Sequence, residues 1–219
     1  MFRENLEEIH ARIENAAARS GRQRAEITLL AVSKTFPASA LIEAYDAGIR
    51  DFGENYIQEF ELKRPQLGPM EDVQFHLIGH LQSNKARKAA ELFQAVQTVD
   101  SAKLARRLSE CGRPLAVMIE VKLSGEESKH GVSPEEIGPL AVAIREMPNL
   151  NLQGLMTMPP WSEDQEQSRP YFARLRELGL KHNLAKLSMG MSNDFEAAIE
   201  EGATHVRIGT ALFGSRKKL

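Results

Sequence analysis

Apolar runs of strand length alternate with amphipathic stretches of helix length along the whole chain. This alternation is typical of repeated βα units, and it predicts a sheet of parallel strands. Strands are predicted at residues 27–33, 50–53, 74–79, 93–99, 115–122, 152–156, 186–189 and 205–208. Eight parallel strands, each followed by a helix, form the (β/α)8 or TIM barrel of the α/β class, and 219 residues are enough for one.

A further helix is predicted before the first strand. Its apolar positions recur every three or four residues, and a glycine follows where a helix can end: Phe2, Leu6, Ile9, Ile13, Ala17 and Gly21. The alternative fold is an open doubly wound sheet, but the turn at residues 33–36 lacks the glycine-rich pattern of a dinucleotide site. The barrel is therefore favoured, with a very short last helix. No linker divides the chain, so residues 1–219 are predicted to form a single domain.

Composition narrows the classes of ligand. A formal net charge of −2 argues against nucleic acid as the main partner, because such binding depends on neutralising phosphates with basic residues. No apolar stretch approaches the length of a membrane span, and the N-terminus lacks the apolar core of a signal peptide. The sequence therefore predicts a cytoplasmic protein with a small-molecule ligand. Its single cysteine, Cys111, cannot form an internal disulfide and is interpreted as structurally incidental.

Polar residues gather after the predicted strands, at the end of a barrel where active sites are built. The apolar run at 27–33 delivers Lys34 to this end, where an amine could act as a covalent catalyst or an anchor. The turns at 188–194 and 207–210 combine glycines with hydroxyls, as a phosphate site requires. A single pocket for a phosphorylated ligand is plausible, and residues that could converge on it include Lys34, Glu54, Asn55, His80, Lys122, Met189, Ser192, Gly209 and Thr210.

These residues also have purely structural interpretations. Taken alone, Lys34 is more often a solvated loop lysine, and Ser192 and Asn193 would serve equally well as N-caps of the helix that follows. The histidines at 76 and 80 have no supporting cysteine or carboxylate pattern, so no metal site is predicted. Arg207 is harder to explain structurally, because an arginine inside a barrel needs a partner, and a ligand could provide one.

Five motifs occur in order along nearly the whole chain, from Leu29 to Arg216. They are AVSKT (31–35), FGENY (52–56) followed by Gln58 and Glu59, HLIGHLQSNK (76–85), LSMGMS (187–192) with Asp194, and RIGTALFG (207–214). Together they resemble the pyridoxal phosphate homeostasis protein family. The resemblance implies a fold-type III pyridoxal phosphate barrel, related to the N-terminal domain of alanine racemases.

The resemblance also implies a role for each matching residue. Lys34 would form the internal aldimine with pyridoxal 5′-phosphate, and Arg207 would face the pyridine nitrogen. The phosphate would be held by Ser192, Gly209 and Thr210, and the pocket would be lined by Asn55, His80 and Met189. One departure is Lys122, which stands where family members often have asparagine and puts the outer wall of the pocket in doubt.

The resemblance and the chemistry together favour a carrier of the cofactor over an enzyme. A guanidinium only donates hydrogen bonds and stays charged, so Arg207 would keep the pyridine nitrogen unprotonated and weaken the cofactor as an electron sink. The leading hypothesis is a cytoplasmic carrier that buffers pyridoxal phosphate, passes it to apo-enzymes and shifts amino-acid and keto-acid pools indirectly. The alternatives are a small racemase or lyase that uses the cofactor, and a cofactor-free aldolase that uses Lys34 as its Schiff-base nucleophile. A monomer is expected, with no nucleic-acid or membrane partner.

Overall fold

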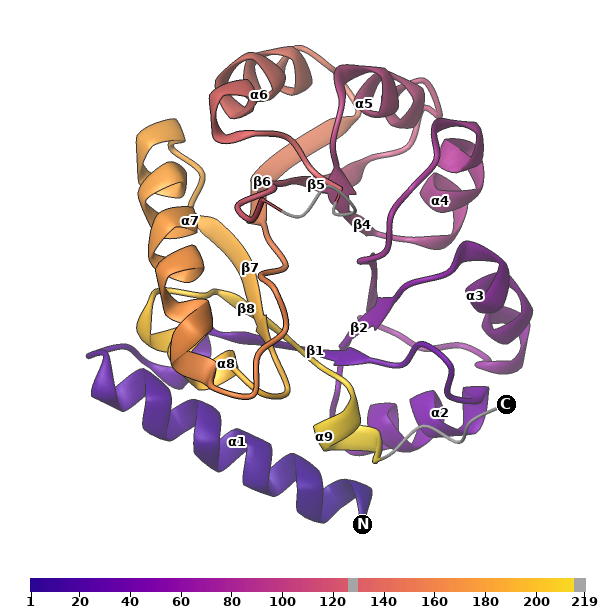
Figure 1. Cartoon of the computed structure of the whole chain (residues 1–219). Coiled ribbons are helices and arrows are strands. Elements are labelled where there is room, and N and C mark those ends of the chain that lie inside the picture. Colours follow the sequence, from indigo (N-terminus) through magenta and orange to yellow (C-terminus); the bar gives the residue numbers. More distant parts are fainter. Residues whose placement is uncertain (126–129, 215–219) are drawn as a thin grey trace.

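Eight parallel strands form a closed barrel in the order of the sequence, and β8 pairs back onto β1 (Figure 1). The computed structural model describes residues 1–125 and 130–214. The predicted (β/α)8 barrel is confirmed. The strands are β1 (Thr28–Val32), β2 (Asp51–Glu54), β3 (Gln74–Leu77), β4 (Ala95–Val99), β5 (Leu115–Glu120), β6 (Leu150–Met156), β7 (Lys186–Met191) and β8 (His205–Ile208).

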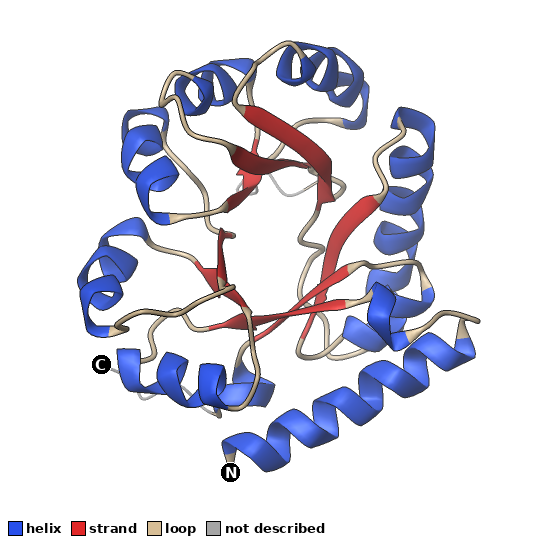
Figure 2. Cartoon of the chain, turned by 180° about the vertical axis from the view of Figure 1, so that it is seen from behind, coloured by secondary structure: helices blue, strands red, loops and turns tan. Residues whose placement is uncertain are grey.

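Helices form a ring outside the strands (Figure 2). The α-helices are α1 (Phe2–Arg19), α2 (Ala38–Asp46), α3 (Ile57–Lys63), α4 (Ala86–Leu92), α5 (Ala102–Ser109), α6 (Ile137–Arg145), α7 (Arg169–His182), α8 (Phe195–Glu200) and α9 (Thr210–Phe213). The 3-10 helices are η1 (Arg24–Glu26), η2 (Arg64–Gln66), η3 (Ser83–Lys85), η4 (Pro134–Glu136) and η5 (Gln165–Ser168). The extra N-terminal helix and the very short last helix are both confirmed. No helix in the described part of the chain is long and apolar enough to cross a membrane.

Several strands end one or two residues from the predicted position, and the differences in β3 and β7 shape the barrel mouth. β3 stops at Leu77, and the carbonyl oxygen of Gly79 accepts a hydrogen bond from Thr98 Oγ1 at 2.8 Å. β7 instead continues to Met191 through a shift of register against β8. Gly190 permits this shift, because its φ of +89° lies in the left-handed region that favours glycine.

The strand period of two divides the apolar residues between two cores. Leu30 and Val32 form a small buried cluster with Ile78. Leu29 and Ala31 alternate with them and belong to the main core, which also holds the buried faces of the helices. Val32 is the last residue of β1, so the chain leaves the barrel at Ser33 and Lys34 follows at its mouth.

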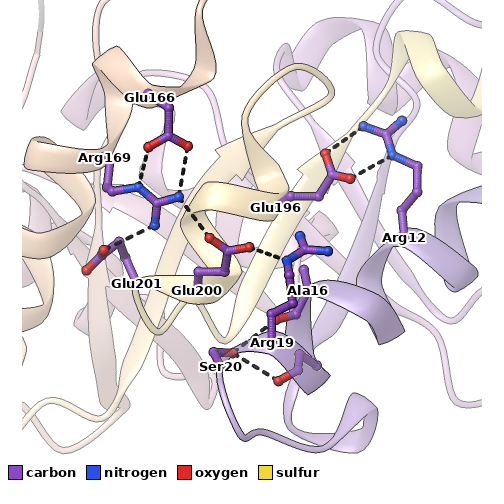
Figure 3. Close-up of polar contacts among 10 residues, drawn as sticks. Arg12, Ala16, Arg19, Ser20, Glu166, Arg169, Glu196, Glu200 and Glu201 are labelled. Carbon is purple, nitrogen blue, oxygen red and sulfur yellow. Dashed lines mark hydrogen bonds and ion pairs between the residues drawn. The ribbon is translucent and has the colours of Figure 1, made fainter.

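Helix α1 is tied to the C-terminal part of the barrel by ion pairs (Figure 3). Arg12 makes a two-pronged contact with Glu196 on α8, at 3.1 and 2.8 Å. Arg19 contacts Glu200 at 2.7 Å, and Glu200 is shared with Arg169 at 2.8 Å. Exposed ion pairs each contribute little to stability, so we assign these contacts mainly a role in fixing the angle of α1 against α8.

The start of α1 also packs against α9. The rings of Phe2 and Phe213 lie 5.2 Å apart, and the side-chain amide of Asn5 donates a hydrogen bond to the carbonyl oxygen of Leu212 at 3.0 Å. Helix α9 has only one turn, which is too short to be stable without such packing. The N-terminal helix therefore supports the segment that follows β8.

Candidate functional site

A hollow of about 360 Å³ opens at the C-terminal ends of the strands. The structure brings six of the predicted site residues together on its wall: Lys34, Asn55, Ser192, Arg207, Gly209 and Thr210. Its other lining residues are Val32, Ile78, Met158, Trp161, Ser162, Met191, Asn193 and Asp194. Lys34 and Thr210 come from opposite ends of the sequence, and they meet because β1 pairs with β8.

Lys34 lies beside Asn55 across the β1–β2 pair. The Lys34 ammonium nitrogen is 3.5 Å from Asn55 Oδ1. Strand pairing sets this proximity, because Val32 on β1 is in register with Gly53 on β2. Lys34 follows Val32 by two residues, and Asn55 follows Gly53 by two residues.

Buried polar residues hold the backbone on the N-terminal side of Lys34. The Ser33 N–H donates to the Gly53 carbonyl oxygen at 3.0 Å, and Ser33 Oγ donates to Glu54 Oε1 at 2.8 Å. Lys63 Nζ donates to the Ser33 carbonyl oxygen and to Glu54 Oε1, both at 2.9 Å. Glu54 is fully buried, and its burial raises the pKa of its carboxyl group, although Lys63 and Ser33 oppose the shift.

The C-terminal side of Lys34 is fixed as well. The backbone N–H of Thr35 donates to Glu59 Oε1 at 2.5 Å, and the same oxygen pairs with Lys63 at 2.5 Å. Thr35 has a φ of +69°, which is uncommon for a residue with a branched side chain. Lys63 thus connects both flanks of Lys34. Glu59 belonged to a recognised motif, but nothing in the sequence pattern indicated Lys63.

Arg207 is fixed inside the barrel beneath the hollow. It donates to Ser188 Oγ at 2.8 Å and to the carbonyl oxygen of Thr157 at 2.9 Å. Its side chain is almost fully buried, and burial lowers the pKa of its guanidinium group to about 10, so it remains charged at neutral pH. A buried arginine needs a partner, and here the partners are a hydroxyl and a carbonyl oxygen. Within the described residues no carboxylate contacts the guanidinium group directly.

A chain of hydrogen bonds runs from Arg207 through the barrel. Ser188 Oγ donates to Gln97 Oε1 at 2.6 Å, and Gln97 Nε2 lies 3.1 Å from His76 Nδ1. The other ring nitrogen of His76 lies 3.1 Å from Asp51 Oδ1, at the start of β2. The expected core role of His76 agrees with this position. The chain fixes the orientation of Arg207 from below.

The turns after β7 and β8 contact each other. The Ala211 N–H lies 3.5 Å from Ser192 Oγ, and the Met191 N–H donates to Asp194 Oδ1 at 2.7 Å. Asp194 occupies the N-cap position of α8, so the interpretation of Ser192 and Asn193 as N-caps is wrong. Ser192 instead faces the hollow with Gly209 and Thr210.

Four of the residues expected to converge on one pocket do not line this hollow: Glu54, His80, Lys122 and Met189. Met189 is fully buried in the main core, because it alternates with Ser188, which points into the barrel. His80 lies further out and stacks on His130, with ring centroids 3.6 Å apart. Sequence reasoning missed Met158 and Trp161. Met191 belongs to the turn at 188–194 that was predicted to form part of the site, but a strand period of two would point its side chain the same way as that of Met189. The shift of register in β7 changes that.

His80, His130 and Asp100 form a second polar group at the mouth. The candidate ligand atoms of these three residues lie within 4.8 Å of one another. The two rings are nearly parallel, with 11° between their planes, so their nitrogen lone pairs do not converge on one point. Burial lowers the pKa of His80, and the neighbouring His130 lowers it further. We assign the group no metal.

The hollow combines an amine, an amide oxygen, a buried guanidinium, hydroxyls and the glycine of a turn. An amine condenses with an aldehyde or ketone, and hydroxyls and backbone N–H groups near a positive charge suit a phosphate. The set fits a small phosphorylated carbonyl compound better than a metal ion, because it offers one carboxylate, and Asp194 already accepts a backbone hydrogen bond.

Comparison with known proteins agrees with this chemistry. The model of the alanine racemase N-terminal domain matches residues 5–217. A protein of Pseudomonas aeruginosa named pyridoxal phosphate homeostasis protein is 52% identical over 219 residues, which cover 97% of this chain and 95% of that protein. Its namesake in Escherichia coli K12 is 46% identical, and the match again covers 97% and 95% of the two chains.

Solved structures give the same result. PipY of Synechococcus elongatus PCC7942, solved with PLP bound, has a TM-score of 0.85 and 36% identity, and the match covers 98% of this chain and all of that one. An alanine racemase of Clostridium difficile 630 has a TM-score of 0.73 but only 16% identity, and the match covers 57% of its chain. That second likeness concerns the fold alone.

Proposed function

Because the chain belongs to the pyridoxal phosphate homeostasis protein family, as its relatives at 46–52% identity show, we propose that it binds pyridoxal 5′-phosphate and carries it covalently and reversibly on Lys34. The single observation that carries the proposal is the convergence of four groups on one hollow: Lys34, Arg207, and the two turns that contain Ser192 and Thr210. A protein 36% identical over nearly the whole chain has been solved with PLP bound.

The residues present fit the cofactor. Bound pyridoxal phosphate supplies an aldehyde that condenses reversibly with a primary amine, a phosphate and a pyridine nitrogen. Lys34 would provide the amine, held in place by Lys63 and Glu59 on its two flanks. The phosphate would be held by Ser192, Gly209 and Thr210, and Arg207 would face the ring nitrogen.

The same residues support a carrier without catalytic turnover. Arg207 offers only donors and stays charged, so it cannot give the ring nitrogen the carboxylate partner that favours carbanion chemistry. Among the described residues that line the hollow, none is a histidine or a tyrosine that could serve as a second acid or base. We therefore propose that the protein buffers the cofactor, with effects on amino-acid and keto-acid pools that follow indirectly.

The cellular setting of this function is also a proposal. Delivery to apo-enzymes would follow from a covalent link that forms and breaks reversibly. A cytoplasmic location and a monomeric state remain predictions from the sequence.

The first test is the visible spectrum of the purified protein before and after borohydride reduction. Reduction should fix the cofactor on the peptide that contains Lys34, and a Lys34→Ala variant should lack the visible band. Lys103→Ala removes an exposed lysine from α5 and should leave the band unchanged. Turnover of an amino acid by the loaded protein would instead identify a racemase or lyase. If the protein stays colourless after pyridoxal phosphate is added, the proposal is contradicted and a cofactor-free aldolase is favoured.

A further inference from the structure

A second hollow, of about 320 Å³, lies next to the first at the barrel mouth. It shares Met158, Trp161 and Met191 with the first, so these three side chains separate the two spaces. Its remaining lining residues are Glu120, Val121, Lys122, Leu123, Ser124, His130 and Pro159. Most of this wall is apolar, but it contains groups of both charges.

Among the residues that the structure describes, two polar atoms of this wall are buried without a hydrogen-bond partner. They are Glu120 Oε2 and Ser124 Oγ, and the Glu120 residue is only 3% exposed. A buried acceptor left unpaired is costly, and native proteins rarely keep one without a reason. A ligand that donates hydrogen bonds would supply the missing partner of Glu120.

Lys122 contributes the opposite charge to the same hollow. It lies two residues after Glu120 on an extended segment, so both side chains leave the backbone on the same side. Within the described part of the chain no ion pair joins Lys122 to Glu120 or to another carboxylate. Two opposite charges thus line one small apolar space without neutralising each other directly.

The ionisable groups near Glu120 allow it to accept a cation at neutral pH. Burial and, to a smaller extent, the charge of Asp100 raise the pKa of its carboxyl group to about 7, although Arg207 opposes the shift. Lys122 and His130 line the hollow from the segment after β5. An arriving ammonium group would favour the ionised carboxylate, because a nearby opposite charge stabilises it.

We propose that this second hollow binds a free amino acid with an apolar side chain. Glu120 and Ser124 receive its ammonium group, Lys122 binds its carboxylate, and Met158 and Trp161 contact its side chain. Binding depends on this hollow alone. Only the use of the bound amino acid rests on the proposed function: if Lys34 carries the cofactor, the amino acid is a primary amine held beside it.

Calorimetric titration with matched probes tests the proposal. L-leucine has both charged groups, 4-methylpentanoate lacks the ammonium group, and 3-methylbutylamine lacks the carboxylate. We expect leucine to bind about tenfold or more tightly than either analogue, because each analogue leaves one charged residue unpaired. The protein is used as purified and also loaded with cofactor and reduced with borohydride, so that exchange of amines at Lys34 adds no heat.

Variants complete the test. Glu120→Gln keeps the volume of the side chain and removes its charge, and it should weaken leucine binding about tenfold or more. Lys122→Met removes the positive charge at the mouth of the hollow, and it should weaken the binding of leucine and of 4-methylpentanoate to the same extent. Lys103→Met is the control and should change nothing. Unfolding curves show which variants are folded. If Glu120→Gln does not fold, the proposal is tested by Lys122→Met and by the three probes on the parent protein. Leucine binding no tighter than that of 4-methylpentanoate, or binding unaffected by the variants, would overturn the proposal.

The two proposals can fail separately. If Lys34 takes up no cofactor while leucine still binds and depends on Glu120 and Lys122, the second hollow stands and the carrier function falls. If the visible band forms on Lys34 but no probe binds, the carrier function stands and the second hollow is overturned.

Discussion

Lys63 Nζ donates a hydrogen bond to the carbonyl oxygen of Ser33, the residue immediately before Lys34. The same ammonium group pairs with Glu54, which is fully buried. A buried ion pair is expensive to desolvate and adds little net stability, but removing one partner leaves an uncompensated charge. We therefore interpret the pair mainly as a contact that fixes the backbone next to Lys34.

Replacing Lys63 should therefore be harmful. We expect Lys63→Met to lower the free energy of unfolding by about 3–5 kcal/mol, because Glu54 loses its buried counter-charge. Urea denaturation measures this loss. The control is Lys63→Met combined with Glu54→Gln, which should recover part of the stability, since no buried charge remains. Equal stability of the single and double variants would contradict this explanation.

Gly190 should not tolerate a side chain. A Cβ atom there would lie 2.6 Å from Ala198 Cβ and 2.9 Å from Phe195 Cα, and the residue has a φ of +89°. We expect Gly190→Ala to cost about 1–2 kcal/mol for the backbone and about 1–3 kcal/mol more for the crowding. Gly48→Ala is the matched control, because Gly48 has a φ of +98° with nothing within 4 Å. Thermal unfolding should show the larger loss for Gly190; equal losses would exclude crowding.

The turns after β7 and β8 should recognise phosphate specifically. Ser192→Ala and Thr210→Val each remove a hydroxyl from the hollow, and a hydrogen bond to a charged group contributes about 1.5–3 kcal/mol. We therefore expect each variant to bind pyridoxal phosphate roughly 10- to 100-fold more weakly. Spectroscopic titration with pyridoxal, which lacks the phosphate, is the control. If a variant weakens the binding of pyridoxal phosphate and of pyridoxal equally, the hydroxyl that it lacks does not contact the phosphate.

Stability should fall with rising pH because of Glu120. The pKa of its carboxyl group is raised from 4.5 to about 7 in the folded protein, so the folded state binds more protons than the unfolded state between these values. The contribution of the protonated carboxyl group is fully present below pH 4.5 and is lost as the pH rises through about 7. This difference corresponds to roughly 3 kcal/mol.

Glu120→Gln removes this titration. The difference in unfolding free energy between the parent protein and the variant, measured from pH 5 to pH 8, isolates Glu120 from every other titrating group. We expect the variant to gain stability relative to the parent as the pH rises. A difference that does not change with pH would show that the carboxyl group titrates normally.

The barrel was predictable because it depends on periods within the sequence. Most of the strands are apolar runs followed by a helix, and Lys34 follows the run at 27–33 directly. Lys63 and Glu120 could not be found this way, because their roles depend on neighbours brought close by folding. Lys63 appears in the sequence as an ordinary charge in the last turn of α3.

Met189 shows a different limit. The motif from 187 to 192 was recognised, but which of its side chains face the hollow depends on a shift of register in β7. Ser188 points into the barrel and Met189 into the main core, while Met191 reaches the hollow. A local change of backbone geometry at Gly190 is invisible to a pattern that counts alternate residues.

The pairing of β1 with β8 has a consequence for protein synthesis. Lys34 is translated early, whereas Gly209 and Thr210 are among the last described residues to leave the ribosome. A growing chain therefore exposes its lysine long before the other half of the hollow exists. The complete hollow can form only on a chain whose eighth strand has been released, so a ligand that needs contacts from both ends of the sequence would be bound only after β8 has paired with β1.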